Sequence, residues 1–376
     1  MKIAIIDPPK THYGAIYYDT RKWHDAFKSN GVEVKLFSGE LVNHPNQLKK
    51  DILSYAPDYT FSVNGLLPDS YGNFFCDVVQ IPHIAFLIDS PARFLPLFKS
   101  KNTIITCLDK NHVDFVKGYG KKEVYFVPMG MDQSLKYSDN PRPYDVTMLY
   151  SCIDYLSILE SWLQKYSKKA VSALKQAATI TLSDTKTSYI QALKQSMIIN
   201  QINPLDIDYP IVLNELDYYI RGYERVAIVN TIQGATVHLF GDSLGTNTWN
   251  DYITNPRVVF HGSVPVTEAL EVMEQSKIVI NAFSPFKEAI HTRVFMAFGK
   301  GALPLTCDNT MTHGCFKDGK EIALFQMSHL NQINETVKKY LDNEKLRKDV
   351  TEKGRAKAVA QHSWDKRCHQ LLKSIS

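Results

Sequence analysis

The fold is decided by the stretch Lys277–Asp308, which reads KIVINAFSPFKEAIHTRVFMAFGKGALPLTCD. Ile278–Ala282 is a short apolar, β-branched run, as expected for a buried parallel strand. A helix is predicted over residues 290–298, and it ends at Gly299–Gly301, because glycine readily takes the positive φ of a helix terminus. Residues 302–306 form a second apolar run. The stretch therefore predicts a strand, a loop, a helix and a second strand, the repeating unit of a parallel α/β sheet.

The loop and first helical turn between these strands gather charged and polar side chains. They are Lys287, Glu288, His291, Thr292 and Arg293. The first turn of a helix leaves backbone N–H groups without intrahelical partners and carries a partial positive charge. With an arginine and a histidine beside it, this helix start suits a phosphate or pyrophosphate. An ordinary solvated helix start would show the same residues, and both interpretations stay open at this point.

This pattern resembles the donor-sugar motif of GT-B glycosyltransferases, in which an acidic loop precedes a helix reading roughly Arg-Val-Phe-Glu-Ala-Met-Ala-x-Gly. More narrowly, the chain is similar to the CgeB-like branch, also called glycosyl transferase group 1. The resemblance covers most of the chain and is stronger in its C-terminal half. It also rests on further segments at residues 85–91, 109–115, 259–265, 318–322 and 362–367.

The resemblance implies an α/β fold of two Rossmann-like domains with a deep inter-domain cleft. Residues 1–137 would form the acceptor-side domain and residues 138–360 the donor domain, in which residues 151–230 are a mostly helical insertion. Residues 361–376 would form a terminal helix that crosses back to the N-terminal domain. The polar segment Ser138–Pro143 contains two prolines and marks the linker.

Strand and helix signals alternate along both halves of the chain, which favours parallel sheets covered by helices on both faces. Ligands bind such sheets at the carboxyl ends of the strands, so the loops at residues 7–14, 89–93 and 109–112 are expected at one edge. Apolar spacing over residues 156–202 predicts a long helical segment, and a further helix is predicted over residues 211–230. The predicted strands are residues 3–6, 32–37, 59–63, 84–88, 103–107 and 124–127, followed by residues 146–150, 237–240, 258–261, 278–282, 302–306 and 322–325.

Length and composition indicate a soluble protein of two domains. The chain has 376 residues, of which 44% are hydrophobic and 22% are charged, and this length exceeds one ordinary core. No run approaches the roughly 20 apolar residues of a membrane helix, and the six cysteines form no Cys-x-x-Cys pair. We therefore expect a cytoplasmic, reducing location and no structural zinc. The net charge of +4 concentrates in residues 341–376, where a solvated helix face is favoured over peripheral membrane or nucleic-acid contact.

By resemblance, the C-terminal half binds a nucleotide-sugar, with a UDP-sugar as the expected donor and no cofactor. Glu288 would reach hydroxyls of the donor sugar. Arg293 and the helix N-terminus would bind the pyrophosphate and stabilise the departing nucleotide, and no dense acidic cluster points to a metal. A tight strand-to-loop turn would explain Gly241 equally well. The predicted donor-binding residues are Gly241, Asp242, Ser243, His261, Gly262, Ser263, Val264, Glu288, His291, Thr292 and Arg293.

A base on the acceptor side is needed if transfer inverts the configuration of the sugar, whereas transfer with retention needs none. Asp89 is the first candidate, since it follows an apolar strand and precedes Pro91. Turn formation by Asp-Ser-Pro would explain Asp89 equally well. Asp19 is a further candidate. The predicted acceptor-side residues are His12, Tyr13, Gly14, His83 and Arg93.

Together these inferences predict a metal-independent glycosyltransferase acting on an unidentified glycan, protein or small molecule, with Asp89, Glu288 and Arg293 as catalytic residues. The alternatives are a nucleotide-sugar epimerase, a nucleic-acid-modifying glycosyltransferase, and a binding protein with reduced catalysis. Met296 supports the last, because it stands where the family has a ribose-binding glutamate and a thioether accepts hydrogen bonds poorly. Asp206–Asp208 matches the Asp-x-Asp metal signature of GT-A enzymes, but the neighbouring prolines favour a loop.

Overall fold

The structure is a computed structural model that describes residues 1–8 and 13–375. It divides into two compact units, which are described separately below. The first unit comprises residues 1–130 and 362–376, and the second comprises residues 131–361. The predicted linker, Ser138–Pro143, therefore lies inside the second unit.

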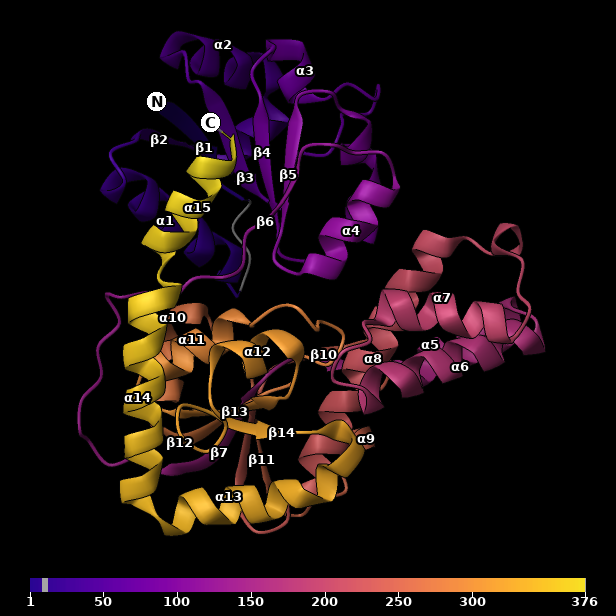
Figure 1. Cartoon of the computed structure of the whole chain (residues 1–376), viewed down its shortest axis with the longest axis vertical. Helices are drawn as coiled ribbons and strands as arrows, with labels where there is room; N and C mark the ends of the chain where they lie inside the picture. Colours follow the sequence, from indigo (N-terminus) through magenta and orange to yellow (C-terminus); the bar gives the residue numbers. More distant parts are fainter. Residues whose placement is uncertain (9–12, 376) are drawn as a thin grey trace. The chain divides into compact units, whose positions relative to one another are not determined.

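The first unit is built on a parallel six-stranded sheet with the order β2-β1-β3-β4-β5-β6 (Figure 1). Its strands are β1 (Lys2–Ile6), β2 (Glu33–Phe37), β3 (Tyr59–Val63), β4 (His83–Leu87), β5 (Thr103–Cys107) and β6 (Val124–Phe126). Its helices are α1 (Ala15–Ser29), η1 (Gly39–Asn43), α2 (Pro45–Tyr55), α3 (Phe75–Val79), η2 (Pro91–Lys99), α4 (Lys110–Gly118) and α15 (Trp364–Ile375). The chain turns from one side of the sheet to the other between β1 and β3, so their carboxyl ends form the switch point where ligands bind in such folds.

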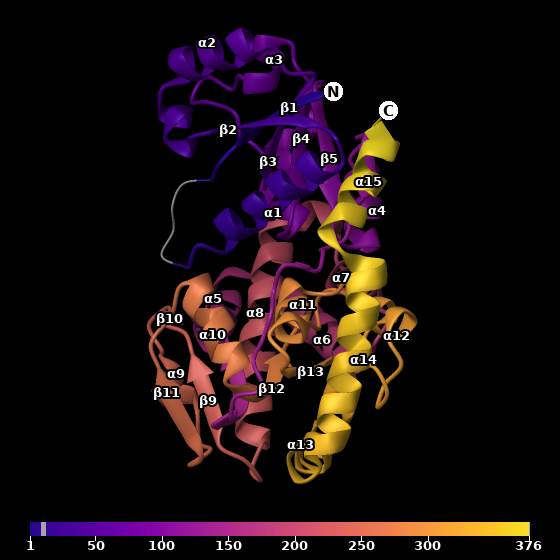
Figure 2. The ribbon, with the colours of Figure 1, turned by 90° about the vertical axis from the view of Figure 1, so that its left-hand side faces the viewer.

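The C-terminal helix α15 packs against α1 in the first unit, and the two lie side by side in both views (Figures 1 and 2). Trp364 meets the buried Trp23 with ring centroids 5.4 Å apart, and Trp23 in turn meets Phe86 of β4 at 5.0 Å. A Cβ on Gly130 would lie 2.5 Å from the Trp364 ring. Aromatic burial of this kind anchors the end of the chain to the first sheet.

The second unit repeats the plan with a parallel six-stranded sheet in the order β11-β9-β7-β12-β13-β14. Its strands are β7 (Tyr144–Leu149), β9 (Val237–Phe240), β11 (Val258–His261), β12 (Ser276–Asn281), β13 (Leu303–Cys307) and β14 (Ala323–Phe325), with a small pair of β8 (Cys152–Ile153) and β10 (Ser243–Leu244). Its helices are α5 (Tyr155–Lys165), α6 (Lys168–Ser183), α7 (Tyr189–Ile199), η3 (Pro204–Asp206), α8 (Tyr209–Thr231), α9 (Trp249–Tyr252), α10 (Val266–Glu274), α11 (Thr292–Gly299), α12 (Thr310–Cys315), η4 (Met327–Gln332), α13 (Ile333–Asp342) and α14 (Glu344–His362). The predicted α/β class with two parallel sheets is confirmed.

The helical insertion differs from its prediction. Residues 156–202 form three helices, α5, α6 and α7, which Figure 1 shows as a group beside the second sheet. The breaks are made by Ser167 and Ser188, whose hydroxyls cap the following helices by accepting the N–H groups of Ala170 and Gln191. Apolar spacing continues through both breaks, whereas the two capping serines mark where the second and third helices begin.

Candidate functional site

The switch point of the second sheet lies between β7 and β12, and a tyrosine joins the two strand ends. Tyr150 directly follows β7, and its hydroxyl donates to Asn281 Oδ1 at the end of β12 (2.8 Å). The same hydroxyl accepts the N–H of Ala282 at 3.1 Å. This ring therefore occupies the place where ligands bind in open parallel sheets.

Two guanidinium groups lie over the Tyr150 ring. The Cζ atom of Arg293, in the first turn of α11, is 3.7 Å from the ring centroid. The Cζ atom of Arg225, in α8, is 4.5 Å from it, and Arg225 Nη1 donates to the Ser151 carbonyl at 2.7 Å. Burial lowers the pKa of Arg225 to about 10, so it stays charged at neutral pH. Cation–π stacking and the backbone contact fix both charges before any ligand arrives.

His291 caps α11 and is held neutral. Its Nδ1 accepts the N–H of Arg293 at 3.0 Å, so the remaining hydrogen is on Nε2. Burial and the charges of Arg293, Arg221 and Arg225 lower the pKa of His291 well below its usual value. The imidazole can therefore donate one neutral hydrogen bond beside three cations.

The nearby carboxylates are already engaged with other groups. Asp217 accepts from Arg221 Nε at 2.8 Å. Glu224 is fully buried and its Oε1 accepts from the Ser284 hydroxyl (2.6 Å) and the Cys307 thiol (2.7 Å). Three arginines, at positions 221, 225 and 293, thus face these two carboxylates, so positive charge is in excess around Tyr150, as an anionic ligand requires.

Sequence reasoning missed the contribution of α8. Arg221, Glu224 and Arg225 follow at helical spacing, which places them on one side of the helix. The segment was interpreted only by its apolar periodicity. Two arginines four residues apart, on a helix that leads to the sheet, were the available signal.

The predicted residues after β9 and β11 contact one another. Asp242 accepts from the N–H of Ser263 at 3.2 Å and also from the Ser263 hydroxyl. Gly241 has a φ of 149°, and a Cβ there would lie 2.1 Å from the Tyr150 carbonyl oxygen. Gly241 is therefore required by the close approach of two backbone segments. Ser243 accepts from the N–H of Trp249 at 3.3 Å.

His261 is used within a stack of rings at the end of β11. Its ring lies 4.1 Å from that of Phe240, and its Nε2 lies 3.1 Å from His238 Nδ1. Burial lowers the pKa of His261. The following Gly262 has open space where a Cβ would stand, and Val264 is half-buried. Of these residues Gly262 is the exposed one.

The loop that carries Glu288 is held in place by hydrogen bonds from Asn309. Asn309 Nδ2 donates to the carbonyls of Phe286 (3.1 Å) and Ala289 (3.0 Å), while Glu288 itself is half-buried. Lys287 is directed away, since its buried Nζ donates to the Thr181 carbonyl of α6 at 2.8 Å. Braced in this way, the loop presents Glu288 just ahead of the first turn of α11, where Thr292 begins the helix.

Met296 lies on α11 with 7% of its surface exposed. It occupies the sequence position where the resembled family places a ribose-binding glutamate. An apolar side chain of this kind cannot accept hydrogen bonds from ribose hydroxyls.

On the first unit, Asp89 lies at the carboxyl edge as expected. Its Oδ2 accepts from Asn64 Nδ2 at 3.0 Å and its Oδ1 from Arg93 Nη1 at 3.4 Å. Asp19 differs, because it is 2% exposed and its Oδ1 has no hydrogen-bond partner among the described residues. Burial raises the pKa of Asp19 to about 8, so at neutral pH it already holds a proton.

His83 is corrected by the structure, because it begins β4 and so lies at the opposite end of the strand from Asp89. Its ring nitrogens lie 2.8 Å from the Thr60 hydroxyl and 2.9 Å from the Ser62 hydroxyl, and burial lowers its pKa to about 3. It is a neutral core histidine. Gly14 caps α1 with a φ of 63° and Tyr13 beside it is exposed, whereas His12 lies outside the described residues.

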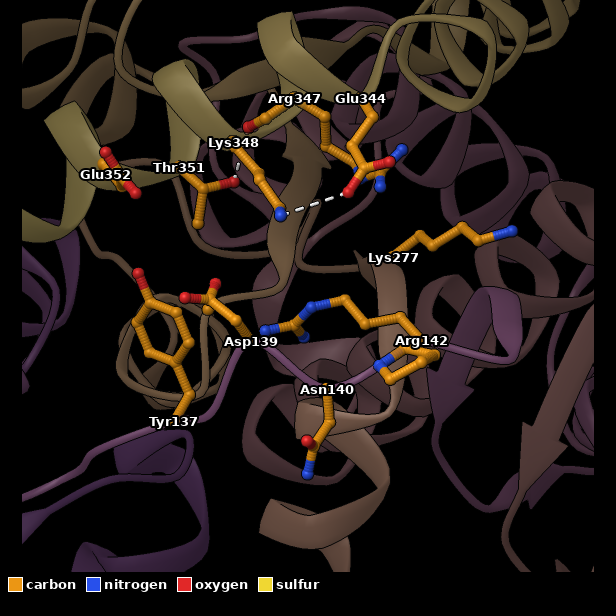
Figure 3. A pocket seen from close by; sticks show the side chains of 12 residues that line it. Tyr137, Asp139, Asn140, Arg142, Lys277, Glu344, Arg347, Lys348, Thr351 and Glu352 are labelled. Atoms are coloured by element: carbon orange, nitrogen blue, oxygen red, sulfur yellow. Dashed lines mark hydrogen bonds and ion pairs between the residues drawn. The ribbon is translucent and has the colours of Figure 1, made fainter.

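A cavity of about 410 Å³ occupies the other end of the second sheet (Figure 3). It is lined by Lys277 at the start of β12 and by α14. Lys348 pairs there with Glu344 at 3.1 Å, and Arg142 donates to the carbonyls of residues 273, 274, 276 and 300. These bonds of Arg142 attach the segment Ser138–Pro143 to the rest of the second unit, which is a structural role.

The basic helices and the Asp-x-Asp segment also have structural roles. Asp208 caps α8 by accepting the N–H of Ile211 at 3.2 Å. No group of three or more His, Cys, Asp or Glu side chains within residues 1–8 and 13–375 could hold a metal. No helix in the described chain is long and apolar enough to cross a membrane. Lysines of α13 and α14 form the ion pairs Lys338–Asp342, Lys348–Glu344, Lys353–Asp349 and Lys357–Glu321.

A family model described as glycosyl transferase-like matches residues 225–373, which include Arg225, Glu288 and Arg293. An α-glucosyltransferase, solved with UDP-glucose and DNA containing an abasic site, shares the fold with a TM-score of 0.58, 12% identity, and coverage of 100% of this chain and 99% of that one. The chain therefore has the GT-B fold, and its residues 225–373 match a glycosyl transferase-like family model.

Two other solved structures share the fold of this chain. Anabaena HepE, in complex with UDP and glucose, has a TM-score of 0.53 and 12% identity, with 100% of this chain and 99% of that chain covered. Sucrose-phosphate synthase from Thermosynechococcus elongatus has a TM-score of 0.57 and 10% identity, with 99% and 97% covered. No curated protein matches the sequence. At these identities the similarity establishes the fold, and the choice of substrates must be argued from the site.

Proposed function

We propose that this chain is a glycosyltransferase that takes its sugar from a UDP-sugar and binds the donor diphosphate at the switch point between β7 and β12. The observation that carries the proposal is the Tyr150 ring with Arg225 and Arg293 over it, at 4.5 Å and 3.7 Å. A diphosphate matches this surplus of positive charge, and the N-terminus of α11 adds backbone donors. Uridine is favoured because two proteins of the same fold were solved with UDP or UDP-glucose.

In the proposed reaction, the bond between the sugar and the diphosphate breaks, and negative charge develops on the departing phosphate oxygen. Arg225 and Arg293 are held in place by Tyr150 and by backbone or side-chain acceptors, so they stabilise this charge with little reorganisation. Because arginines supply the charge, we propose that transfer is independent of metal. Glu288 contacts hydroxyls of the donor sugar from the braced loop.

On the acceptor side, Asp89 takes the proton from the attacking hydroxyl. It is 30% exposed in its side chain and is oriented by two donors, Asn64 and Arg93. Asp19 is less suited to this role at neutral pH, since burial raises its pKa to about 8 and a protonated carboxyl accepts no further proton. An ionised carboxylate with fixed orientation is the usual requirement for a general base.

The proposal is tested by calorimetric titration with UDP, GDP, CDP and ADP, followed by transfer assays with the matching sugars. We expect saturable binding of UDP and transfer that survives treatment with EDTA. Absence of binding by all four nucleotides to folded protein would contradict the donor site and favour a binding protein with reduced catalysis. Activity that disappears with EDTA and returns with Mg²⁺ would contradict metal independence alone.

A further inference from the structure

The turn that ends β3 has an uncommon backbone. Asn64 has a φ of 61° and Gly65 a φ of 73°. Glycine is favoured at the second position by its positive φ, and because a Cβ there would lie 2.9 Å from the Cβ of Ala85. A left-handed conformation costs a residue with a side chain on the order of 1 kcal/mol and often marks a functional position. The left-handed conformation of Asn64 is therefore expected to be stabilised by specific contacts.

The side-chain amide of Asn64 makes the contacts that stabilise this conformation. Its Oδ1 accepts the N–H of Ile88 at 3.0 Å, and its Nδ2 donates to Asp89 Oδ2 at 3.0 Å. The backbone N–H of Asn64 also donates to the Phe86 carbonyl at 2.8 Å. Both ends of the amide are thus fixed, and the Nδ2 donor points at the carboxylate.

We infer that Asn64 is a positioning residue that sets the orientation of the Asp89 carboxylate for proton transfer from the acceptor. This inference rests on the proposed role of Asp89. Arg93 holds the other carboxylate oxygen at 3.4 Å, a longer contact from a more flexible side chain. Of the two donors, Asn64 is the rigid one, because its turn and its bond to Ile88 leave it little freedom. Positioning of a reacting group within an ångström can decide about two orders of magnitude in rate.

The test is a double-mutant cycle in the full-length enzyme, using Asn64→Gly and Asp89→Asn. Glycine keeps the left-handed turn and removes only the amide. We expect Asn64→Gly to lower kcat about tenfold or more while the donor KM stays within about twofold. In the Asp89→Asn background the same change should have no further effect, because Asn64 acts only through Asp89.

Gln80→Gly is the matched control, since Gln80 is also left-handed (φ 57°) and bonds to Asp77 rather than to Asp89. Its kcat should equal that of the wild type. The inference is overturned if Asn64→Gly keeps wild-type kcat, or if it lowers kcat equally with and without Asp89. If Asp89→Asn itself keeps full activity, the proposed base fails, which is a separate and distinguishable result.

Discussion

At the carboxyl edge of the second sheet, Arg225 and Arg293 lie over an aromatic ring, whereas at the same edge of the first sheet Asn64 and Arg93 donate to a carboxylate. Both sheets have six parallel strands, with the switch point between β1 and β3 in the first and between β7 and β12 in the second. The backbone plan therefore leaves the chemistry open. Side chains at the strand ends make one edge suitable for an anion and the other for a proton.

The difference is also one of pairing. In the first unit Arg21 meets Asp7 at 2.7 Å and Arg93 meets Asp89 at 3.4 Å. In the second unit three arginines, at positions 221, 225 and 293, lie near Tyr150 together with only two carboxylates, Asp217 and Glu224. A site with unbalanced positive charge attracts a diphosphate, and a paired carboxylate keeps its place for catalysis.

The comparison is tested most severely by Asp89→Asn. Loss of a general base typically lowers kcat by about 10²–10⁴-fold, and we expect UDP affinity to stay the same. Asp114→Asn, at an exposed position of α4, is the control and should be silent. Loss of UDP affinity in Asp89→Asn would instead place this carboxylate in the nucleotide site.

Glu288→Gln tests whether Glu288 of the second unit contacts hydroxyls of the donor sugar. The amide keeps the shape but loses an acceptor for sugar hydroxyls, so we expect about a tenfold fall in kcat with UDP affinity changed less than about twofold. Steady-state kinetics and calorimetry on the same sample separate the two quantities. Full activity would remove Glu288 from the site.

Asp19→Asn tests whether the buried carboxyl of Asp19, in α1, has a raised pKa and is protonated at neutral pH. Its folded pKa of about 8 exceeds the reference value of 3.8, so stability is lost as pH rises between these values, because the unfolded chain ionises first. The loss is roughly 1.4 kcal/mol for each pH unit. Asp19→Asn should therefore raise Tm at a pH of about 7.5 and change it little near pH 4. If wild type and Asp19→Asn have the same Tm at a pH of about 7.5 as well as at about pH 4, Asp19 is solvated and its pKa is not raised by burial.

Much of the fold could be predicted because each buried strand is a short apolar run between turn residues, as in Ile278–Ala282. The helix start at His291–Arg293 was likewise visible from its charges. The breaks in residues 156–202 were missed, because an apolar stripe shows a helical face and does not show where one helix ends.

The site was harder to predict because it depends on residues distant in sequence. Tyr150 meets Arg293 because β7 and β12 are neighbours in the sheet, and Arg225 joins them from α8. His83 directly precedes the apolar run of residues 84–88, so chain direction alone puts it at the amino end of the strand, away from the carboxyl edge, and its assignment to the acceptor site was wrong. Asn64 carried no charge pattern, and its left-handed backbone is invisible in a single sequence.

The most direct measurement is the UDP affinity of wild type, Arg225→Ala, Arg293→Ala and Arg257→Ala by isothermal titration calorimetry. Arg257 is exposed and lies in the second unit, so it controls for loss of charge alone. Removing a charge-assisted contact worth roughly 1.5–3 kcal/mol should weaken UDP binding about 10- to 100-fold in the first two variants, and Arg257→Ala should bind as wild type does. Unchanged affinity in both Arg225→Ala and Arg293→Ala would contradict a donor site at Tyr150.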